Sequence, residues 1–437
     1  MKKRIPLIIT AAALLLFAGL FFFLYRNNDT LRFQKLSEEI FAQSLSQDSL
    51  SLHYTLADPS PYLKAPSPAT LPAYSRESQK EAAALLENQL LVLQEINPEK
   101  LNSHDRYTWS LLTSYLENEL AGARCEYYEE PLAPSSGMQS QLPVLLAEYT
   151  FRTKSDMEDY LEILESIPAY LESLAVYEKE KANAGLFMTE ADAGEIVDQC
   201  DAIMAPDLLS AGEHFLQTTF QERLDGLVED GQLKPEEEEF YISENNRLLT
   251  TVVSPAYTAL ADSIFLLSGS GSHNGGLCEL PSGIAYYLYL LRRNTGSSRT
   301  PEEIQSLLSD QFQNLYQNLQ ALVETYREQT GTGTITLDDL PPSLPECPGD
   351  SDDLQNRCRR IFLPWPSSPT ACPPAGPNLW QNPWRISPAR LYLTPPIDDM
   401  DDNVIYVNNL HLPGLSLHQL AHEAILPPVT DSLQPAL

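Results

Sequence analysis

Residues 75–96 read SRESQKEAAALLENQLLVLQEI, and this stretch decides the class of fold. Its apolar side chains recur at intervals of three and four residues, which is the repeat of one face of an α-helix. The residues on that face are Ala82, Leu85, Leu86, Leu90, Leu93 and Ile96. Asn97-Pro98 follows directly, and a proline disfavours helix at the residue before it. The stretch therefore predicts an amphipathic helix that ends at Ile96.

The same periodicity continues from residue 30 to about residue 340 and predicts a mainly α fold with one large multi-helix domain. Strand-like alternation is scarce, apart from a short β element near the C-terminus at Val404-Ile405-Tyr406-Val407. Further helices are expected at residues 103–120, 155–167, 190–204, 208–229, 234–267 and 301–329.

Cap residues place the starts of several of these helices. Ser103 is an N-cap candidate, and Ser155 with Glu158 resembles a capping box. Pro168 is expected to kink or restart the helix that follows. Thr300 precedes a proline and two acids, an order that helix starts prefer.

The composition sets broad limits on the molecule. With 437 residues and 43% hydrophobic content, the chain can bury a large core. Its net charge of -32 argues against nucleic acid and anionic lipid headgroups as general partners, because both would be repelled. The acidic run Glu236 to Glu239 is interpreted as a solvated helix face rather than a cation site, because calcium loops need spaced oxygens and a turn glycine.

The N-terminus predicts a membrane anchor over residues 1–26. Met1-Lys2-Lys3-Arg4 is followed by an apolar run from Ile5 to Tyr25, long enough at ~1.5 Å per residue to span a ~30 Å hydrocarbon core. The small residues that mark a cleavage site are not at the end of this run, which favours an uncleaved anchor. The basic residues before the run predict a single-pass protein of the cell membrane whose remainder is extracytoplasmic, or a secreted one if the segment is cleaved.

Residues 341–388 differ in composition from the predicted helical domain at 27–340. They contain three of the four tryptophans, three of the six cysteines and about a dozen prolines. One interpretation is a proline-rich recognition linker, and another is a stretch of altered reading frame. The six cysteines include no C-x-x-C pair, and their spacing argues against a disulfide framework.

The segment at residues 389–437 holds the candidate catalytic chemistry. Leu417-His418-Gln419-Leu420-Ala421-His422-Glu423 ends in a His-Glu pair of the kind that opens a zinc-hydrolase signature. In such a site His422 would bind the metal, and Glu423 would be the general base that activates the metal-bound water. The usual second histidine would stand at position 426, where this chain has Leu426. Because a single imidazole does not hold zinc against water, we predict that this chain binds no zinc.

Several stretches together resemble the bacterial DUF885 family, whose members look like zinc-dependent peptidases with a largely helical fold. The resemblance runs from about residue 30 and is carried by Leu101 to Tyr107, Leu280 to Gly283, Tyr286-Tyr287, Leu290 to Arg292, Thr300 to Ile304, Leu391 to Asn409 and Leu420 to Glu423. It implies a peptide substrate and a second metal-binding histidine at position 428, where this chain has Pro428, with a third ligand beyond Leu437. The metal site is thus incomplete, and we hypothesise a truncation or frameshift, because the codons of Pro427 to Thr430 can spell Pro-Gly-His in a shifted frame.

Two alternatives remain open. His418 and His422 are four residues apart and could share a metal on one helix face. The protein could also be a non-catalytic helical surface protein that binds a peptide or a partner without cleaving it.

Other candidate residues have simpler interpretations. His53, His104, His214 and His273 show no ligand spacing and are predicted to be surface or capping side chains. The glycine and serine run at 268–276 is interpreted as a connection between helices rather than a phosphate loop, because no Lys-Ser/Thr follows. Tyr286 and Tyr287 are expected either in the core or along a cleft.

Overall fold

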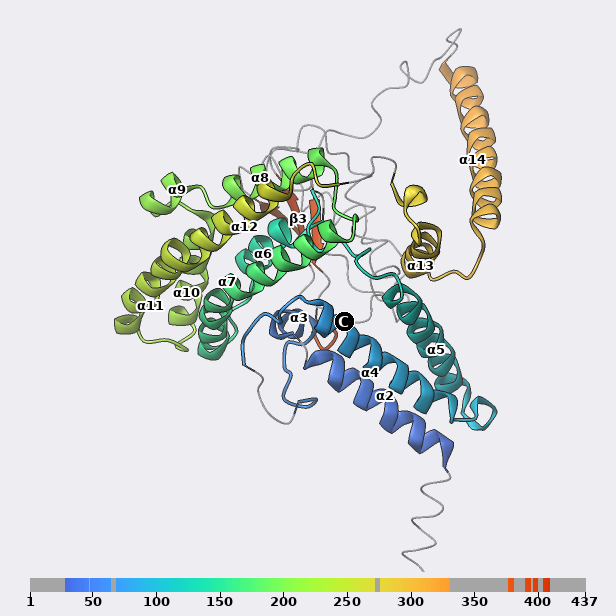
Figure 1. Cartoon of the computed structure of the whole chain (residues 1–437), viewed down its shortest axis with the longest axis horizontal. Coiled ribbons are helices and arrows are strands. Elements are labelled where there is room, and N and C mark those ends of the chain that lie inside the picture. Colours follow the sequence, from blue (N-terminus) through green and yellow to red (C-terminus); the bar gives the residue numbers. More distant parts are fainter. Residues whose placement is uncertain are drawn as a thin grey trace, which may run out of the picture.

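The computed structural model describes residues 28–46, 48–63, 68–134, 136–271, 276–330, 376–380, 390–393, 396–399 and 404–408. Helices dominate this part of the chain (Figure 1), so the prediction of a mainly α fold is confirmed. The predicted membrane segment at 5–25 and the stretch from residue 409 onward, which includes His422 and Glu423, lie outside the described residues.

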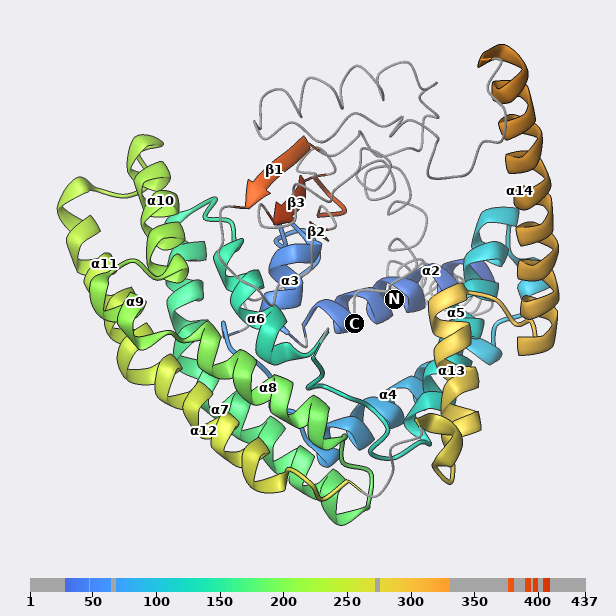
Figure 2. The ribbon, with the colours of Figure 1, turned by 90° about the horizontal axis from the view of Figure 1, so that it is seen from above.

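The helices form two lobes that are seen side by side in Figure 2. The smaller lobe contains α2 (Asp29–Leu45), α4 (Arg76–Gln94), η1 (Pro98–Lys100) and α5 (Ser103–Ala123), with η3 (Leu277–Glu279) and α13 (Gly283–Thr295) against α5. The larger lobe contains α6 (Met138–Ala147), α7 (Lys154–Asn183), α8 (Glu190–Ile203), α9 (Pro206–Ala211), α10 (Phe215–Glu229), α11 (Pro235–Leu248), η2 (Leu249–Val253) and α12 (Ser254–Leu267). Helix α3 (Ser49–Thr55) connects the lobes, and α14 (Pro301–Thr330) stands at the outer edge.

The smaller lobe has a core of its own, and the opening stretch of the sequence supplies part of it. Leu93 of α4 and Ile96, which follows the helix, are buried against Phe33 of α2 and Leu116 of α5. Ser75 caps α4 through a reciprocal pair of hydrogen bonds with Ser78, which confirms the predicted start. The predicted helix therefore forms because one face is apolar and its first N–H groups are satisfied.

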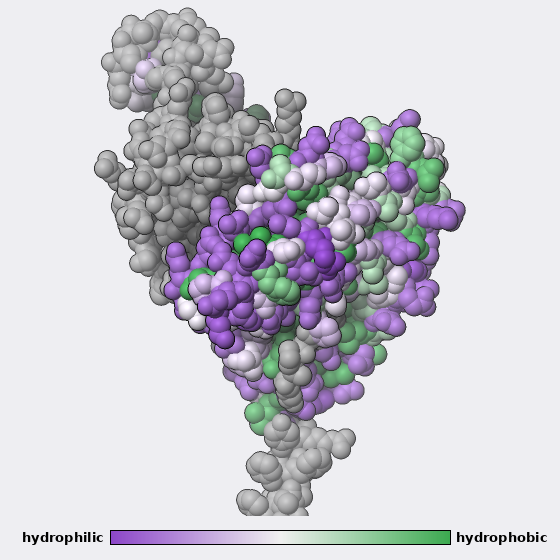
Figure 3. Space-filling model, turned by 90° about the vertical axis from the view of Figure 1, so that its left-hand side faces the viewer, coloured by the Kyte–Doolittle hydropathy of each residue, from purple (hydrophilic) through white to green (hydrophobic). Residues whose placement is uncertain are grey.

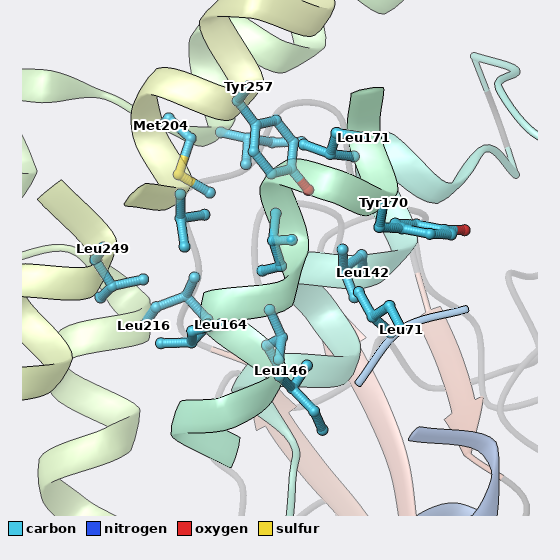
Figure 4. Packing of buried hydrophobic residues seen from close by; sticks show 14 of the residues in the cluster. Leu71, Leu142, Leu146, Leu164, Tyr170, Leu171, Met204, Leu216, Leu249 and Tyr257 are labelled. Atoms are coloured by element: carbon cyan, nitrogen blue, oxygen red, sulfur yellow. The ribbon is translucent and has the colours of Figure 1, made fainter. Parts of the chain in front are cut away.

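The larger core is built around α7, whose buried side chains recur on several faces because helices surround it (Figure 4). Leu164 and Leu171 of α7 are buried with Leu216 of α10 and with Leu249 and Tyr257 of the α11–α12 region. Burying one such side chain stabilises the fold by roughly 1.5–3 kcal/mol. Pro168 lies inside α7, which continues to Asn183, so the helix does not restart at the proline.

Two predicted helix starts were displaced by one or two residues. Asn102, not Ser103, caps α5, because its side-chain oxygen accepts the N–H of Asp105 at 2.9 Å. Thr153, not Ser155, caps α7, in a capping box with Asp156. In both places another short polar residue lies upstream of the predicted cap, and the helix begins after that earlier residue.

The single helix predicted at 208–229 is wrong, because the chain forms two helices there. Gly212 has a positive φ of 75° and ends α9, a conformation that glycine adopts without a Cβ clash. His214 then caps α10, accepting the N–H of Leu216 at 3.3 Å.

The stretch predicted at 234–267 is continuous but contains a π-helical turn, η2, between α11 and α12. Pro255 follows this turn and has no N–H to donate, which is a usual cause of such a distortion. Pro235–Leu267 is also long and apolar enough to cross a membrane by length and composition alone. Its buried residues, including Leu249 and Tyr257, belong to the large core, whereas Phe265 and Leu266 at its end are exposed.

The acidic run of α11 lies on the outer side of the larger lobe, where hydrophilic residues predominate and apolar ones are scattered (Figure 3). Glu236 and Glu239 are exposed, and Glu237 binds Lys154 of α7 at 2.7 Å. These positions agree with the interpretation as a solvated helix face.

Three short strands, β1 (Gly376–Trp380), β2 (Arg390–Leu393) and β3 (Val404–Asn408), form a sheet in the order β1-β3-β2. β3 pairs in parallel with β1 and antiparallel with β2. The turn before β3 is tied to the end of α3, since the Asp398 carboxylate accepts the N–H groups of Ala57 and Asp58 at 2.7 and 2.9 Å. Burial opposes the charge of Asp398, but these donors outweigh it and lower its pKa.

Candidate functional site

The predicted metal ligand His422 and general base Glu423 lie outside the described residues, as does His418. Within the described ranges, no group of three or more His, Cys, Asp or Glu side chains is placed to hold a metal ion. The predicted zinc chemistry therefore stays a prediction.

A cavity of about 560 Å³ opens where three segments of the chain meet between the lobes. Its walls come from the loop after α5, the C-terminal end of α7 and the turn before α13. The lining residues are Arg124, Glu126, Tyr128, Ala184, Gly185, Leu186, Glu279, Leu280, Pro281 and Ser282. Ligand sites are common at such junctions, because two bodies together enclose more surface than either does alone.

The turn before α13 is held against the cavity by a hydrogen bond and by a close backbone contact. The Ser282 N–H donates to the Tyr128 hydroxyl at 2.7 Å. Gly283 approaches the Leu277 carbonyl so closely that an added Cβ would overlap it. The stretch Leu280 to Gly283 thus forms a rigid wall, with a glycine required by the close backbone approach.

The loop after α5 contains a backbone conformation that is rare for its residue type. Tyr127 has a φ of 66°, in the left-handed region that favours glycine. The Arg76 guanidinium lies 5.5 Å from its ring centroid and also forms an ion pair with Glu126. The Tyr127 hydroxyl donates to Glu180 of α7 at 3.4 Å. These contacts hold the loop between the lobes despite a strain of roughly 1–3 kcal/mol.

Beneath this loop α7 buries two opposite charges. The side chains of Glu178 and Lys181 are fully buried, with Nζ and Oε1 3.6 Å apart. Lys181 donates to the Glu129 carbonyl at 3.1 Å, whereas the Glu178 oxygens have no hydrogen-bond partner in the described part of the chain. Burial raises the pKa of Glu178 to about 7, and the Lys181 charge only partly opposes this shift. A buried carboxyl that titrates near neutrality is a frequent feature of functional sites.

A second polar network lies on the α5–α13 side of the junction. The Tyr289 hydroxyl donates to Glu119 at 3.1 Å and accepts from Arg293 at 3.2 Å. Burial raises the pKa of Glu119, against the opposing effect of Arg293. The Tyr289 ring lies directly on Gly122, where a Cβ would meet ring atoms at 2.6 Å. The small residue therefore permits the contact that fixes α13 to α5.

The two tyrosines that the sequence could not assign have different surroundings. Tyr286 is buried and packs on Tyr128, with ring centroids 5.4 Å apart. Tyr287 is 47% exposed and faces α14. Sequence reasoning missed Glu178 and Lys181, although one signal was present: both fall within the apolar pattern that continues from Leu171 and Leu174.

The histidines were predicted to be surface or capping residues, and this was wrong for His53. His53 is buried, stacks on Tyr149 with centroids 3.6 Å apart, and accepts the Thr150 N–H at 3.1 Å. Burial lowers its pKa to about 3, with contributions from Arg152 and Arg223, so its ring is neutral. His104 is exposed, His214 is the cap of α10, and His273 lies outside the described residues.

The fold and the junction cavity define a large, mainly α protein with a ligand-sized cavity between two helical lobes. The sequence model of the family "Bacterial protein of unknown function (DUF885)" matches residues 63–361, well over half of the chain, and the chain belongs to this family. No curated protein matches it. A solved structure, described as "putative lipoprotein from Colwellia psychrerythraea", is similar with a TM-score of 0.73 and 14% identity, over 91% of this chain and 71% of that chain. At this identity the likeness supports the fold.

Proposed function

We propose that the chain is a membrane-associated, extracytoplasmic DUF885 protein that binds peptides in the junction cavity. The cavity is the observation that carries this proposal, because its lining suits a peptide. Arg124 offers a cation for carboxylate groups, Glu279 offers an anion for amino groups, and Tyr128, Leu186, Leu280 and Pro281 offer apolar contact. Glu126 is already paired with Arg76, which leaves Arg124 and Glu279 as the charges proposed to bind the ligand.

The proposed location is supported by two observations of different kinds. The sequence has an apolar run at 5–25 preceded by three basic residues, and a solved structure with a similar fold is described as a "putative lipoprotein". Both observations support a protein that is associated with the membrane and lies outside the cytoplasm.

The relation to zinc peptidases is a second part of the proposal and rests on His422 and Glu423. In an intact site His422 would bind zinc, and Glu423 would accept a proton from the bound water. Leu426 and Pro428 occupy the positions of a second histidine, so we propose that this chain neither binds zinc tightly nor cleaves peptides.

The test uses the full chain in detergent micelles. Binding of a peptide library is measured by fluorescence anisotropy for the wild type, Arg124→Ala and the control Arg299→Ala, which removes an exposed arginine outside the cavity. A charged hydrogen bond contributes roughly 1.5–3 kcal/mol, so Arg124→Ala is expected to weaken binding about 10- to 100-fold. Equal affinities of all three proteins would refute binding in this cavity.

Zinc content and turnover separate the binding protein from the peptidase. Metal analysis of dialysed protein is expected to find no stoichiometric zinc, and the library is expected to stay intact. Chelator-sensitive cleavage that is lost in Glu423→Gln would instead establish a peptidase.

A further inference from the structure

Helix α14 stands at the outer edge of the described part of the molecule (Figure 1), and many of its large apolar side chains are exposed. Leu308, Phe312, Leu315 and Leu322 are 62%, 64%, 64% and 67% exposed. Within the described residues no helix or strand covers this face, and contiguous apolar patches of this kind mark interaction surfaces.

The spacing of the face matches a helix–helix seam. Leu308, Phe312, Leu315, Leu319 and Leu322 follow one another at alternating intervals of four and three residues. This is the a and d pattern of a heptad repeat, which places all five side chains in one straight seam. The helix is 30 residues long, or ~45 Å at ~1.5 Å per residue, so the seam can contact a second helix over most of its length.

The charges of α14 indicate which kind of partner could bind this apolar face. The positions beside the seam, Ser309, Gln311, Tyr316, Asn318 and Val323, are uncharged. The helix as a whole has five acids and a single basic residue. A helix that lies on an anionic lipid surface is usually rich in Lys and Arg, so the composition disfavours lipid. The neutral seam lets two copies of an acidic chain meet without placing like charges opposite each other.

We propose that this seam binds the same seam of a second copy of the chain, forming a symmetric dimer through α14. A two-fold interface uses one self-complementary patch, which the heptad pattern provides. With about 150–250 Å² per large side chain, the exposed parts of the five seam residues amount to on the order of 500 Å². A standard interface buries about 800 Å² per partner, so the seam supplies more than half of the area that a dimer needs, and the neutral positions beside it supply the rest.

The groove between α13 and α14 gives the interface a second anchor point. It has a volume of about 530 Å³ and lies beside the first residues of the seam, lined by Tyr287, Pro301, Ile304, Gln305, Leu308, Ser309, Phe312 and Gln313. An apolar side chain of the partner's α14 fits such a groove, as anchor residues do in protein interfaces.

Sedimentation equilibrium of the full chain in density-matched micelles tests the proposal. The wild type is expected to be a dimer at micromolar concentration, and Leu315→Glu/Leu319→Glu a monomer. The control Asn314→Glu/Gln317→Glu adds the same charge to the same helix outside the seam, at exposed positions, and is expected to stay dimeric. Because each copy has a net charge of -32, raising the salt concentration is expected to strengthen the dimer by screening.

Hydrogen exchange of the wild type provides a readout that does not depend on the folding of any variant. Amides at 301–330 are expected to exchange more slowly as protein concentration rises, while those of α4 stay unchanged. A wild type that is monomeric at all concentrations, a seam variant that still dimerises, or protection of α14 that appears only with lipid vesicles would each overturn the proposal.

Discussion

Glu178 is expected to make the stability of this protein depend on pH, and Glu178→Gln removes that dependence. The unfolded carboxyl titrates at its ordinary pKa of 4.5, whereas burial raises the folded value to about 7. Between these two values the folded state binds more protons than the unfolded state, so the free energy of unfolding falls as pH rises. At 1.36 kcal/mol per pKa unit, the loss attributable to this group is about 3 kcal/mol, complete above pH 7. Below pH 4.5 the Glu178 carboxyl is protonated in both the folded and the unfolded state, and none of this stability is lost.

The assay is urea denaturation followed by circular dichroism, for wild type and Glu178→Gln, from pH 4 to pH 8.5. The difference in free energy of unfolding between the two proteins is the informative quantity. Other groups with raised pKa values, such as Asp159 at about 6 and Glu119, are present in both proteins and cancel. From pH 4 to pH 8.5, the free energy of unfolding of Glu178→Gln is expected to rise by about 3 kcal/mol relative to that of the wild type. A difference that does not change with pH would refute the argument that Glu178 is buried and titrates near neutrality.

Three further predictions concern other parts of the fold. Leu164→Ala is expected to lower the free energy of unfolding by roughly 2–5 kcal/mol, because it leaves a cavity in the core around α7. The control Leu164→Met is expected to lower it by less than about 1.5 kcal/mol, and both values are measured by urea denaturation. Gly283→Ala is expected to lower the melting temperature and weaken peptide binding, because its Cβ would displace the Leu277 carbonyl at the cavity wall; an unchanged melting temperature would contradict the close approach. The His53 ring is expected to stay neutral down to pH of about 3, so its proton NMR signals would not titrate near pH 6.5, and acid would cost stability progressively below pH 6.5 as the unfolded histidine takes up a proton.

The positions of the helices were largely predictable from the sequence, because they depend on local patterns. The α4 stripe and its stop at Asn97-Pro98 gave the helix to within two residues, and the acids after Thr300 marked the start of α14, where the Thr300 N–H is bonded to Glu303 at 2.8 Å. The errors occurred where neighbouring signals compete. Asn102 was available as a cap one residue before Ser103, and Gly212 ended a helix inside a pattern that otherwise continued.

The junction cavity was not predictable from any single stretch. Arg124, Ala184 and Ser282 come from three segments far apart in sequence, and only the packing of α5, α7 and α13 brings them together. Glu178 and Lys181 continue the spacing of Leu171 and Leu174, but the sequence does not show what covers them. Their burial follows from the loop that carries Glu129, which covers them from outside the helix.

By itself, the sequence determined the helical class of this protein, the approximate extent of most helices and the acidic character of its surface, because these depend on the period and the charge of neighbouring residues. Only the tertiary structure decided which polar groups lose contact with water. Burial depends on what packs from elsewhere in the chain, and burial is the reason that Glu178 titrates near neutrality and that His53 stays neutral. Helix α14 is the opposite case, since its extent was predicted from the sequence, and the structure showed that its apolar face is exposed.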